Sequence, residues 1–199
     1  MTQPATIVIA GDELVAGEGD PRALGWTGRV QARTLPLLPE ARFLTLAVPG
    51  ETSQQLAKRC MPEVQRRLDP ERRNLLVLAP GAGDVRTQAS LARSRLNLAN
   101  VLDEALALEI STFVVGPAPV GDDVLNEQIG TLSSGFADVA TRRGVPYVDA
   151  FRPLQRHEAW LRDVRTGTPG VPGQEGYGLL AWLVLHQGWH SWLGLPEQV

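Results

Sequence analysis

The segment Thr6-Ile7-Val8-Ile9-Ala10-Gly11-Asp12-Glu13-Leu14 is a short apolar run that ends in a Gly-Asp turn. A run of this length predicts a buried strand, and the turn then places residue 13 at the carboxyl end of that strand. In open sheets of parallel strands, ligands bind at this end. The side chain of Glu13 is therefore the first candidate functional group.

Similar apolar runs recur along the chain, and segments with helical periodicity separate them. This alternation predicts a mostly parallel sheet with helices on both faces, a three-layer α/β/α sandwich. Thr52 or Ser53 is placed to cap the second helix, Pro62 to kink or break it, and Gly144 to end the fourth. The predicted strands are residues 6–10, 43–48, 75–79, 113–115 and 145–148, and the predicted helices are residues 28–38, 52–68, 90–108, 124–143 and 174–186.

Length and composition are those of an ordinary globular protein. The 199 residues are 43% hydrophobic and 21% charged, which predicts one domain over residues 1–199. A net charge of −3 gives no electrostatic reason to expect nucleic-acid binding. Cys60 is the only cysteine, so no intrachain disulfide can form. We expect no membrane span and no secretory signal, hence a cytoplasmic protein, because the sequence contains neither pattern.

Four short motifs follow one another in the order and spacing of a known family. Each is a weak match alone, but together they closely resemble the blocks of the SGNH (GDSL-type) hydrolases, a family of lipases and acylhydrolases. The resemblance covers nearly the whole chain and implies the SGNH-hydrolase, flavodoxin-like fold with a five-stranded parallel sheet. The motifs are Gly11-Asp12-Glu13-Leu14, Val48-Pro49-Gly50-Glu51-Thr52-Ser53, Gly81-Ala82-Gly83-Asp84, and Thr168-Pro169-Gly170-Val171-Pro172 with Gly176-Tyr177 after it.

The resemblance also shows where this chain departs from the family. In the family, a serine of the first block is the nucleophile, and this position is Glu13. A glycine of the second block and an asparagine of the third donate hydrogen bonds to the oxyanion; these positions are Gly50 and Gly83. The aspartate and histidine of the last block complete the triad, and here they are Thr168 and Val171. Every side chain that reacts in the family is therefore different.

Ester hydrolysis by a Ser-His-Asp triad is not supported by these residues. Loss of one oxyanion donor typically slows turnover roughly 100- to 1000-fold, and loss of the triad costs on the order of a millionfold. We therefore expect a pseudoenzyme that keeps the ancestral cleft for an unknown small molecule or protein partner. One alternative is changed chemistry, with Glu13 as general acid or base and backbone N–H groups of residue 13 and Gly50 as oxyanion donors. Another is residual esterase or acylhydrolase activity, which a family-level label would assign.

Three interpretations of Glu13 are open at this stage. Partial burial would raise its pKa toward neutrality, as suits a general base. It would otherwise be a solvated carboxylate in a vestigial cleft, or would fold back onto the backbone N–H groups that hold the oxyanion in the family. Asp12 and Asp84 are expected to make structural hydrogen bonds. Their spacing with Glu13 is not that of a known metal loop, so we predict no metal and no cofactor.

The histidines and tryptophans fall late in the chain. His157 could approach the cleft and replace the lost base, but an exposed helix residue is the simpler interpretation. His186 and His190 are four apart, yet Gly188 between them argues against a helical metal site. Trp182, Trp189 and Trp192 are expected to pack the last helix and tail onto the core, with a partner surface as the alternative. Cys60 reads as a small core residue.

Overall fold

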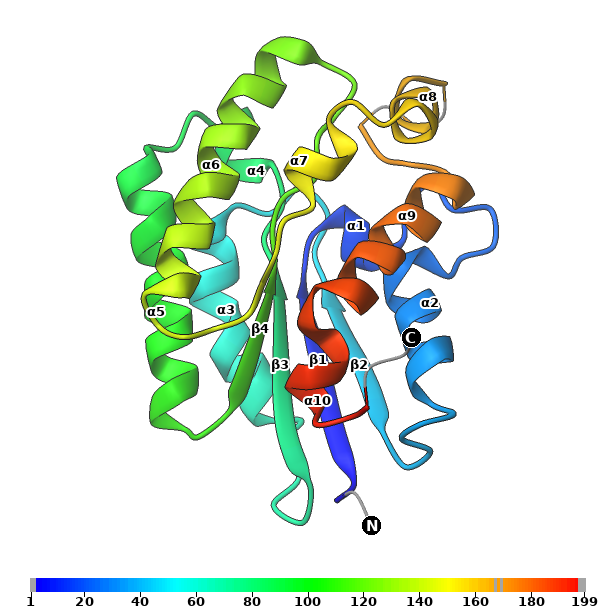
Figure 1. The fold of residues 1–199 in the computed structure, drawn as a ribbon. Coiled ribbons are helices and arrows are strands. Elements are labelled where there is room, and N and C mark those ends of the chain that lie inside the picture. The colour runs from blue at the N-terminus through cyan, green and yellow to red at the C-terminus, as the bar shows by residue number, and fades with distance from the viewer. Residues whose placement is uncertain (1–2, 167, 169, 197–199) are drawn as a thin grey trace.

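The computed structural model describes residues 3–166, 168 and 170–196. At its centre is one sheet of five parallel strands in the order β2-β1-β3-β4-β5 (Figure 1). All five predicted strands are present, although the fifth is shorter than predicted, and the three-layer α/β prediction is confirmed. The strands are β1 (Ala5–Gly11), β2 (Arg42–Ala47), β3 (Arg73–Ala79), β4 (Ser111–Val115) and β5 (Tyr147–Val148).

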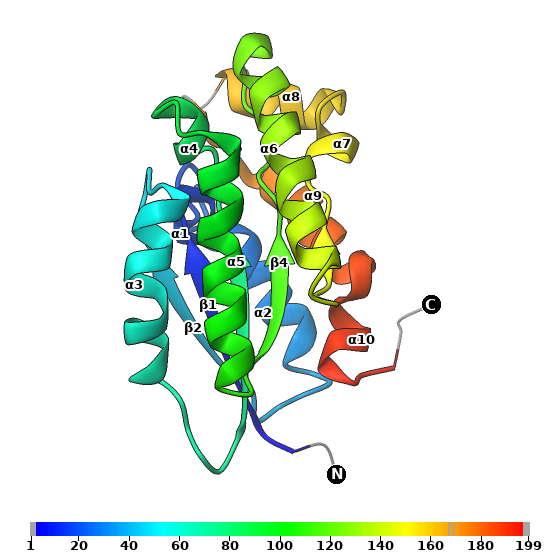
Figure 2. The same ribbon diagram turned by 90° about the vertical axis from the view of Figure 1, so that its left-hand side faces the viewer.

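Helices cover both faces of the sheet. Figure 2 shows α3 and α5 on one side of it and α2 and α10 on the other. The longer helices are α2 (Gly25–Thr34), α3 (Ser53–Gln65), α5 (Leu91–Ala107), α6 (Asp123–Thr141), α8 (Glu158–Thr166) and α9 (Gln174–Val184). The short helices, of which the first precedes α2, are α1 (Glu13–Ala16), α4 (Gly83–Arg86), α7 (Phe151–Leu154) and α10 (His190–Leu193). None of the helices in the described ranges has the length and apolarity needed to cross a bilayer.

The alternation of side chains along β1 divides the interior into two cores. Ile7 and Ile9 belong to the core shared with α2 and α9, whereas Val8 and Ala10 belong to the core shared with α3, α5 and α6. All seven residues of β1 are buried. Because β1 is covered on both faces, its apolar residues follow one another rather than alternate with polar ones, and Thr6 is its one polar residue.

Two predicted helix features need correction. The first helix begins at Gly25 and ends at Thr34, earlier than the predicted 28–38. Pro62 does not break α3, which continues to Gln65 because Cys60, Met61 and Val64 are buried against the core. Thr52 does cap α3, through a reciprocal bond pair with Gln55. Gly144 follows α6 with a φ of 65°, as expected of a residue that ends a helix.

The C-terminal segment is less regular than the predicted single helix over residues 174–186. Helix α9 ends at Val184, and a π-helical turn, η1 (Leu185–Trp189), kinks at Gln187 and at Gly188, whose φ is 94°. Trp189 and Trp192 pack on Phe113 as expected. Trp182 does not pack on the core, since it is 56% exposed. The expectation that all three tryptophans pack onto the core is therefore wrong for Trp182.

Candidate functional site

A cavity of about 770 Å³ opens where the strands end. The loops and helices that follow β1, β2, β3 and β4 all contribute to its wall, as the sheet-edge argument predicts. Pro169 of the last motif lies outside the described residues. The lining residues are Glu13, Glu18, Pro49, Gly50, Arg86, Val120, Gly121, Asp122, Leu125, Val164, Arg165, Thr168, Gly170 and Val171.

Glu13 is brought to the cavity by a short helix that begins where β1 ends. Asp12 caps this helix, because Oδ1 of its carboxyl group accepts a hydrogen bond of 3.0 Å from the N–H of Leu14. Glu13 follows as the first residue of α1, and Gly17 ends the helix with a φ of 74°. The Gly-Asp turn of the sequence thus fixes where the Glu13 side chain starts.

Both carboxylate oxygens of Glu13 are bound by the protein. Oε1 accepts a hydrogen bond of 2.7 Å from Nη1 of Arg86, which also makes this contact an ion pair. Oε2 accepts a hydrogen bond of 2.8 Å from the backbone N–H of Gly50. Glu13 therefore ties together the segments that follow β1, β2 and β3. The glycine whose N–H would serve the oxyanion in the related family here binds a carboxylate of the protein itself.

The pKa of Glu13 is shifted downward, whereas a general base at neutral pH needs a pKa shifted upward toward about 7. Burial favours a higher pKa, but the hydrogen bonds from Arg86 and Gly50 outweigh it and hold the pKa of Glu13 below its usual value. The expected rise of the Glu13 pKa toward neutrality is therefore wrong. The interpretation as a solvated carboxylate is also wrong, because Glu13 is 6% exposed. The third interpretation, a carboxylate turned onto the backbone donors, matches the observed contact.

The pKa of Asp12 is shifted in the opposite direction from that of Glu13. It is almost fully buried, and burial together with the adjacent Glu13 charge raises the pKa of Asp12 to about 8. A Cβ built on Gly81 would lie 1.5 Å from Oδ2 of Asp12, so only glycine leaves room for this carboxyl group. Its bond to Leu14 confirms the structural role that was expected of Asp12.

A second set of contacts holds the loop after β2 against α4. Asp84 accepts a hydrogen bond of 2.7 Å from the N–H of Ser53, which confirms its structural role. Glu51 forms an ion pair with Arg59 through both of its oxygens. A Cβ built on Gly83 would lie 2.2 Å from the carbonyl oxygen of Glu51. The position where the related family has an asparagine is thus filled by this loop's backbone.

The other predicted site positions also lie in the cavity wall. Thr168 is exposed and Val171 is buried, and the methyl group of Val171 packs against Gly19. Among the described residues that line the cavity there is no serine, cysteine, histidine, lysine or tyrosine. His157 is exposed just before α8 and does not belong to that lining. The wall therefore presents no ordinary nucleophile with a neighbouring base.

In the part of the chain that the structure describes, no group of three or more His, Cys, Asp or Glu residues converges. Sequence reasoning missed Arg86, the partner of Glu13, because it falls two residues beyond the third motif. The available signal was its charge, since a buried carboxylate at the sheet edge requires a cation nearby.

Comparison with known proteins places this geometry in context. A model of the GDSL-like lipase/acylhydrolase family matches residues 9–179. No curated protein matches the sequence significantly.

The solved structures give a consistent likeness of fold. A lipase/acylhydrolase from Enterococcus faecalis is similar with a TM-score of 0.75 and 20% identity, over 98% of this chain and 99% of that chain. A psychrotrophic esterase from Pseudoalteromonas sp. is similar with a TM-score of 0.71 and 16% identity, over 95% and 98%. An acetylxylan esterase from Geobacillus stearothermophilus gives 0.71 and 16%, over 100% and 99%. At these identities the likeness concerns the fold alone.

Proposed function

The chain belongs to the GDSL-like lipase/acylhydrolase family, and we propose that it is a non-catalytic member whose cleft binds a small molecule. The observation that carries this proposal is the Glu13 carboxylate, bound by the N–H of Gly50 and by Arg86. In this state the backbone donor of Gly50 is occupied by the protein. An ester carbonyl would have to displace a charged, hydrogen-bonded group before it could use that donor.

The residues around Glu13 support the same conclusion. Transfer of an acyl group needs a nucleophile and a base within hydrogen-bond reach of each other. Among the described lining residues, Thr168 supplies the only hydroxyl side chain and there is no histidine. Changed chemistry with Glu13 as a general base is disfavoured, because a carboxylate with a lowered pKa is a weaker base near neutral pH.

The size and lining of the cleft favour binding over a collapsed remnant. Val171 and its loop form part of the wall but leave a cavity of about 770 Å³, within the range of small-molecule sites. Val120, Leu125 and Val164 supply apolar surface. Arg86 and Arg165 provide positive charge beside Glu13, Glu18 and Asp122. A mostly apolar wall with a few convergent polar groups is the usual composition of a binding pocket.

The catalytic half of the proposal is tested with the purified wild-type protein and Glu13→Gln. We expect neither protein to hydrolyse short activated acyl esters above the buffer rate. We also expect neither to be labelled by a serine-directed fluorophosphonate, because the described cleft offers no activated hydroxyl. Stoichiometric labelling of one serine, with esterase activity lost in parallel, would overturn the assignment.

The binding half is tested with a metabolite library screened by thermal shift and confirmed by calorimetry. Thr168→Trp places a large side chain at the exposed edge of the cleft, and Thr131→Trp places the same side chain on an exposed turn of α6. A cleft ligand should lose binding to the first variant and keep it with the second. Equal binding to both variants would locate the ligand elsewhere.

A further inference from the structure

A second cavity lies in a groove between α2 and α9 and extends to the segment that follows α9. Figure 1 shows these two helices side by side in front of the sheet. The groove has a volume of about 510 Å³, also within the range of small-molecule sites. Its lining consists of Arg29, Arg33, Gly178, Ala181, Trp182, Leu185, His186 and His190, and none of these eight residues is in the wall of the cleft.

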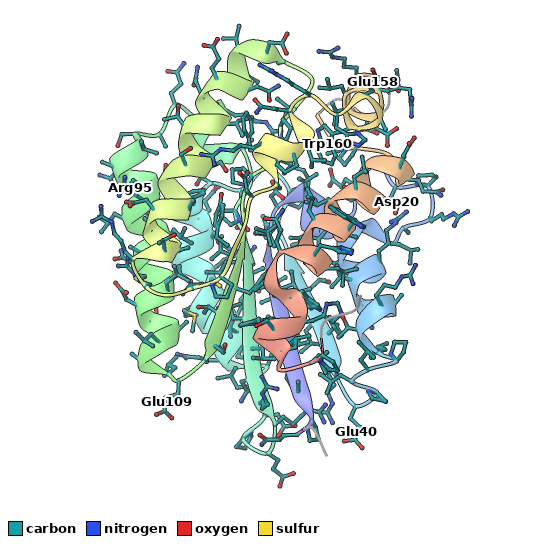
Figure 3. The ribbon with its side chains drawn as sticks, in the orientation of Figure 1. Asp20, Glu40, Arg95, Glu109, Glu158 and Trp160 are labelled. Carbon is teal, nitrogen blue, oxygen red and sulfur yellow. The ribbon has the colours of Figure 1, made fainter. Side chains whose placement is uncertain are left out.

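The charged groups in the groove all carry or can carry positive charge. Arg29 and Arg33 lie one turn apart on α2, and the lining contains no Asp or Glu. Arg29 is held in place by an ion pair with Asp20, which Figure 3 labels, and by a hydrogen bond of 2.7 Å to the carbonyl oxygen of Gly25. Arg33 is exposed. Because Asp20 compensates the charge of Arg29, Arg33 is the arginine of the groove that can pair with an anionic ligand.

The aromatic groups form a flat surface beside these arginines. Trp182 is 56% exposed and stacks on His186, with ring centroids 4.2 Å apart and planes at 23°. Gly178 lies four residues before Trp182, one turn back on the same face of α9, and Ala181 directly precedes Trp182. A Cβ at Gly178 would meet nothing within 4 Å. This leaves open space for a planar ring next to the tryptophan.

The two histidines add polar groups without a full set of partners. Nδ1 of His186 lies 2.7 Å from the carbonyl oxygen of Trp182 and must donate to it, so Nε2 lies on the other side of the ring. His190 is 7% exposed, and its Nδ1 lies 3.3 Å from the carbonyl oxygen of Leu185. Its buried Nε2 has no hydrogen-bond partner in the described residues. A buried polar atom of this kind is unusual and calls for a partner.

We propose that this groove is a second binding site, for a small anion carried on a planar aromatic ring, such as a nucleoside monophosphate. The ring stacks on Trp182 over Gly178, the anionic group pairs with Arg33, and a sugar hydroxyl donates to Nε2 of His186. The guanidinium of an arginine can bind two phosphate oxygens at once through two parallel N–H···O hydrogen bonds. His190, at the kink after α9, gains the hydrogen-bond partner that its Nε2 lacks. This proposal does not depend on the proposed function of the cleft.

The test uses adenosine monophosphate as the probe, with adenosine and inorganic phosphate as separate arms. The protein has three histidines, so their ring signals can be followed individually by NMR. We expect adenosine monophosphate to shift the His186 and His190 signals saturably and to leave that of His157 unchanged. Adenosine and phosphate should each bind at least about tenfold more weakly, because each makes only part of the contacts.

Variants locate the site. Arg33→Gln and Trp182→Leu should each weaken binding about tenfold or more, whereas Arg66→Gln, an exposed arginine after α3, should bind as the wild type does. Unchanged thermal unfolding verifies that these surface variants fold. Absence of saturable binding at millimolar concentration would overturn the proposal, as would equal affinity for phosphate alone. Loss of binding in Thr168→Trp but not in Arg33→Gln would place the probe in the cleft and would also overturn it.

Discussion

Glu13 is the residue at which this chain differs most from the catalytic pattern of its family. A serine at this position would present a short hydroxyl, whereas the longer glutamate reaches the N–H of Gly50 and Arg86. An ionised carboxylate that is 6% exposed needs these partners, because an unpaired buried charge is strongly unfavourable. The residue that replaces the nucleophile thus connects the segments that follow β1, β2 and β3.

A double-mutant cycle on Glu13 and Arg86 measures this connection. Glu13→Gln keeps the shape of the side chain but weakens two charge-assisted hydrogen bonds, so we expect a loss of roughly 1–3 kcal/mol in the free energy of unfolding. Combined with Arg86→Gln, the coupling energy should be about 1 kcal/mol, a modest value because the Arg86 side chain is 35% exposed. Denaturant unfolding of the four proteins gives both numbers.

The control for that cycle is an exposed ion pair in the same protein. Arg162 and Glu175 are 2.6 Å apart, with side chains 58% and 56% exposed. Their coupling should be smaller than that of Glu13 and Arg86, because water and salt screen both partners. Equal coupling in the two cycles would contradict the view that Glu13 is held by a partly buried ion pair.

At the scale of secondary structure, the sequence predicts the sheet well and the short helices poorly. β1 and most of β3 are continuous apolar runs, and the other strands contain shorter ones, so the strand positions are visible without tertiary information. Helices α1 and α4 are four residues long, too short for any helical period to appear. They nevertheless carry Glu13 and Arg86. The motifs could therefore locate the site, while the pairing within it depends on how separate loops meet in three dimensions.

The start of α4 provides a test of how closely two loops approach. Gly83→Ala should destabilise the protein by roughly 1–3 kcal/mol, because a Cβ there would lie 2.2 Å from the carbonyl oxygen of Glu51. Gly178→Ala is the matched control, since a Cβ inside α9 meets nothing and should stabilise the helix by roughly 0.5–1 kcal/mol. Thermal and denaturant unfolding compare the two variants. A neutral Gly83→Ala would show that the loop of Glu51 moves away freely.

At the scale of the whole molecule, the carboxyl groups divide into two sets with opposite effects on stability. In Glu13 and Asp20, burial is outweighed by hydrogen bonds from Arg86 and Arg29 and from backbone N–H groups, so the pKa of each is lowered. The hydrogen bond from Arg143 lowers the pKa of Asp103 in the same direction. Such groups stabilise the folded protein when ionised. Their contribution is lost as the pH falls below the ordinary carboxyl range.

The second set consists of Asp12 and Glu51. Burial raises the pKa of Asp12 from about 3.8 to about 8, and burial also raises the pKa of Glu51 despite its ion pair with Arg59. These groups hold a proton in the folded protein at pH values where the unfolded chain has released it. Stability therefore falls as the pH rises from the ordinary value of an aspartate toward about 8.

The two effects together predict a free energy of unfolding that is greatest at mildly acidic pH and declines toward pH 8. Asp12→Asn removes the carboxyl group with the larger upward shift, so the variant should lose most of this decline and gain stability relative to the wild type as the pH rises. Asp123→Asn is the control, because its side chain is 88% exposed. Urea unfolding across a pH series measures the three curves. Parallel curves for wild type and Asp12→Asn would contradict this prediction, because they would mean that Asp12 is ionised in the folded protein.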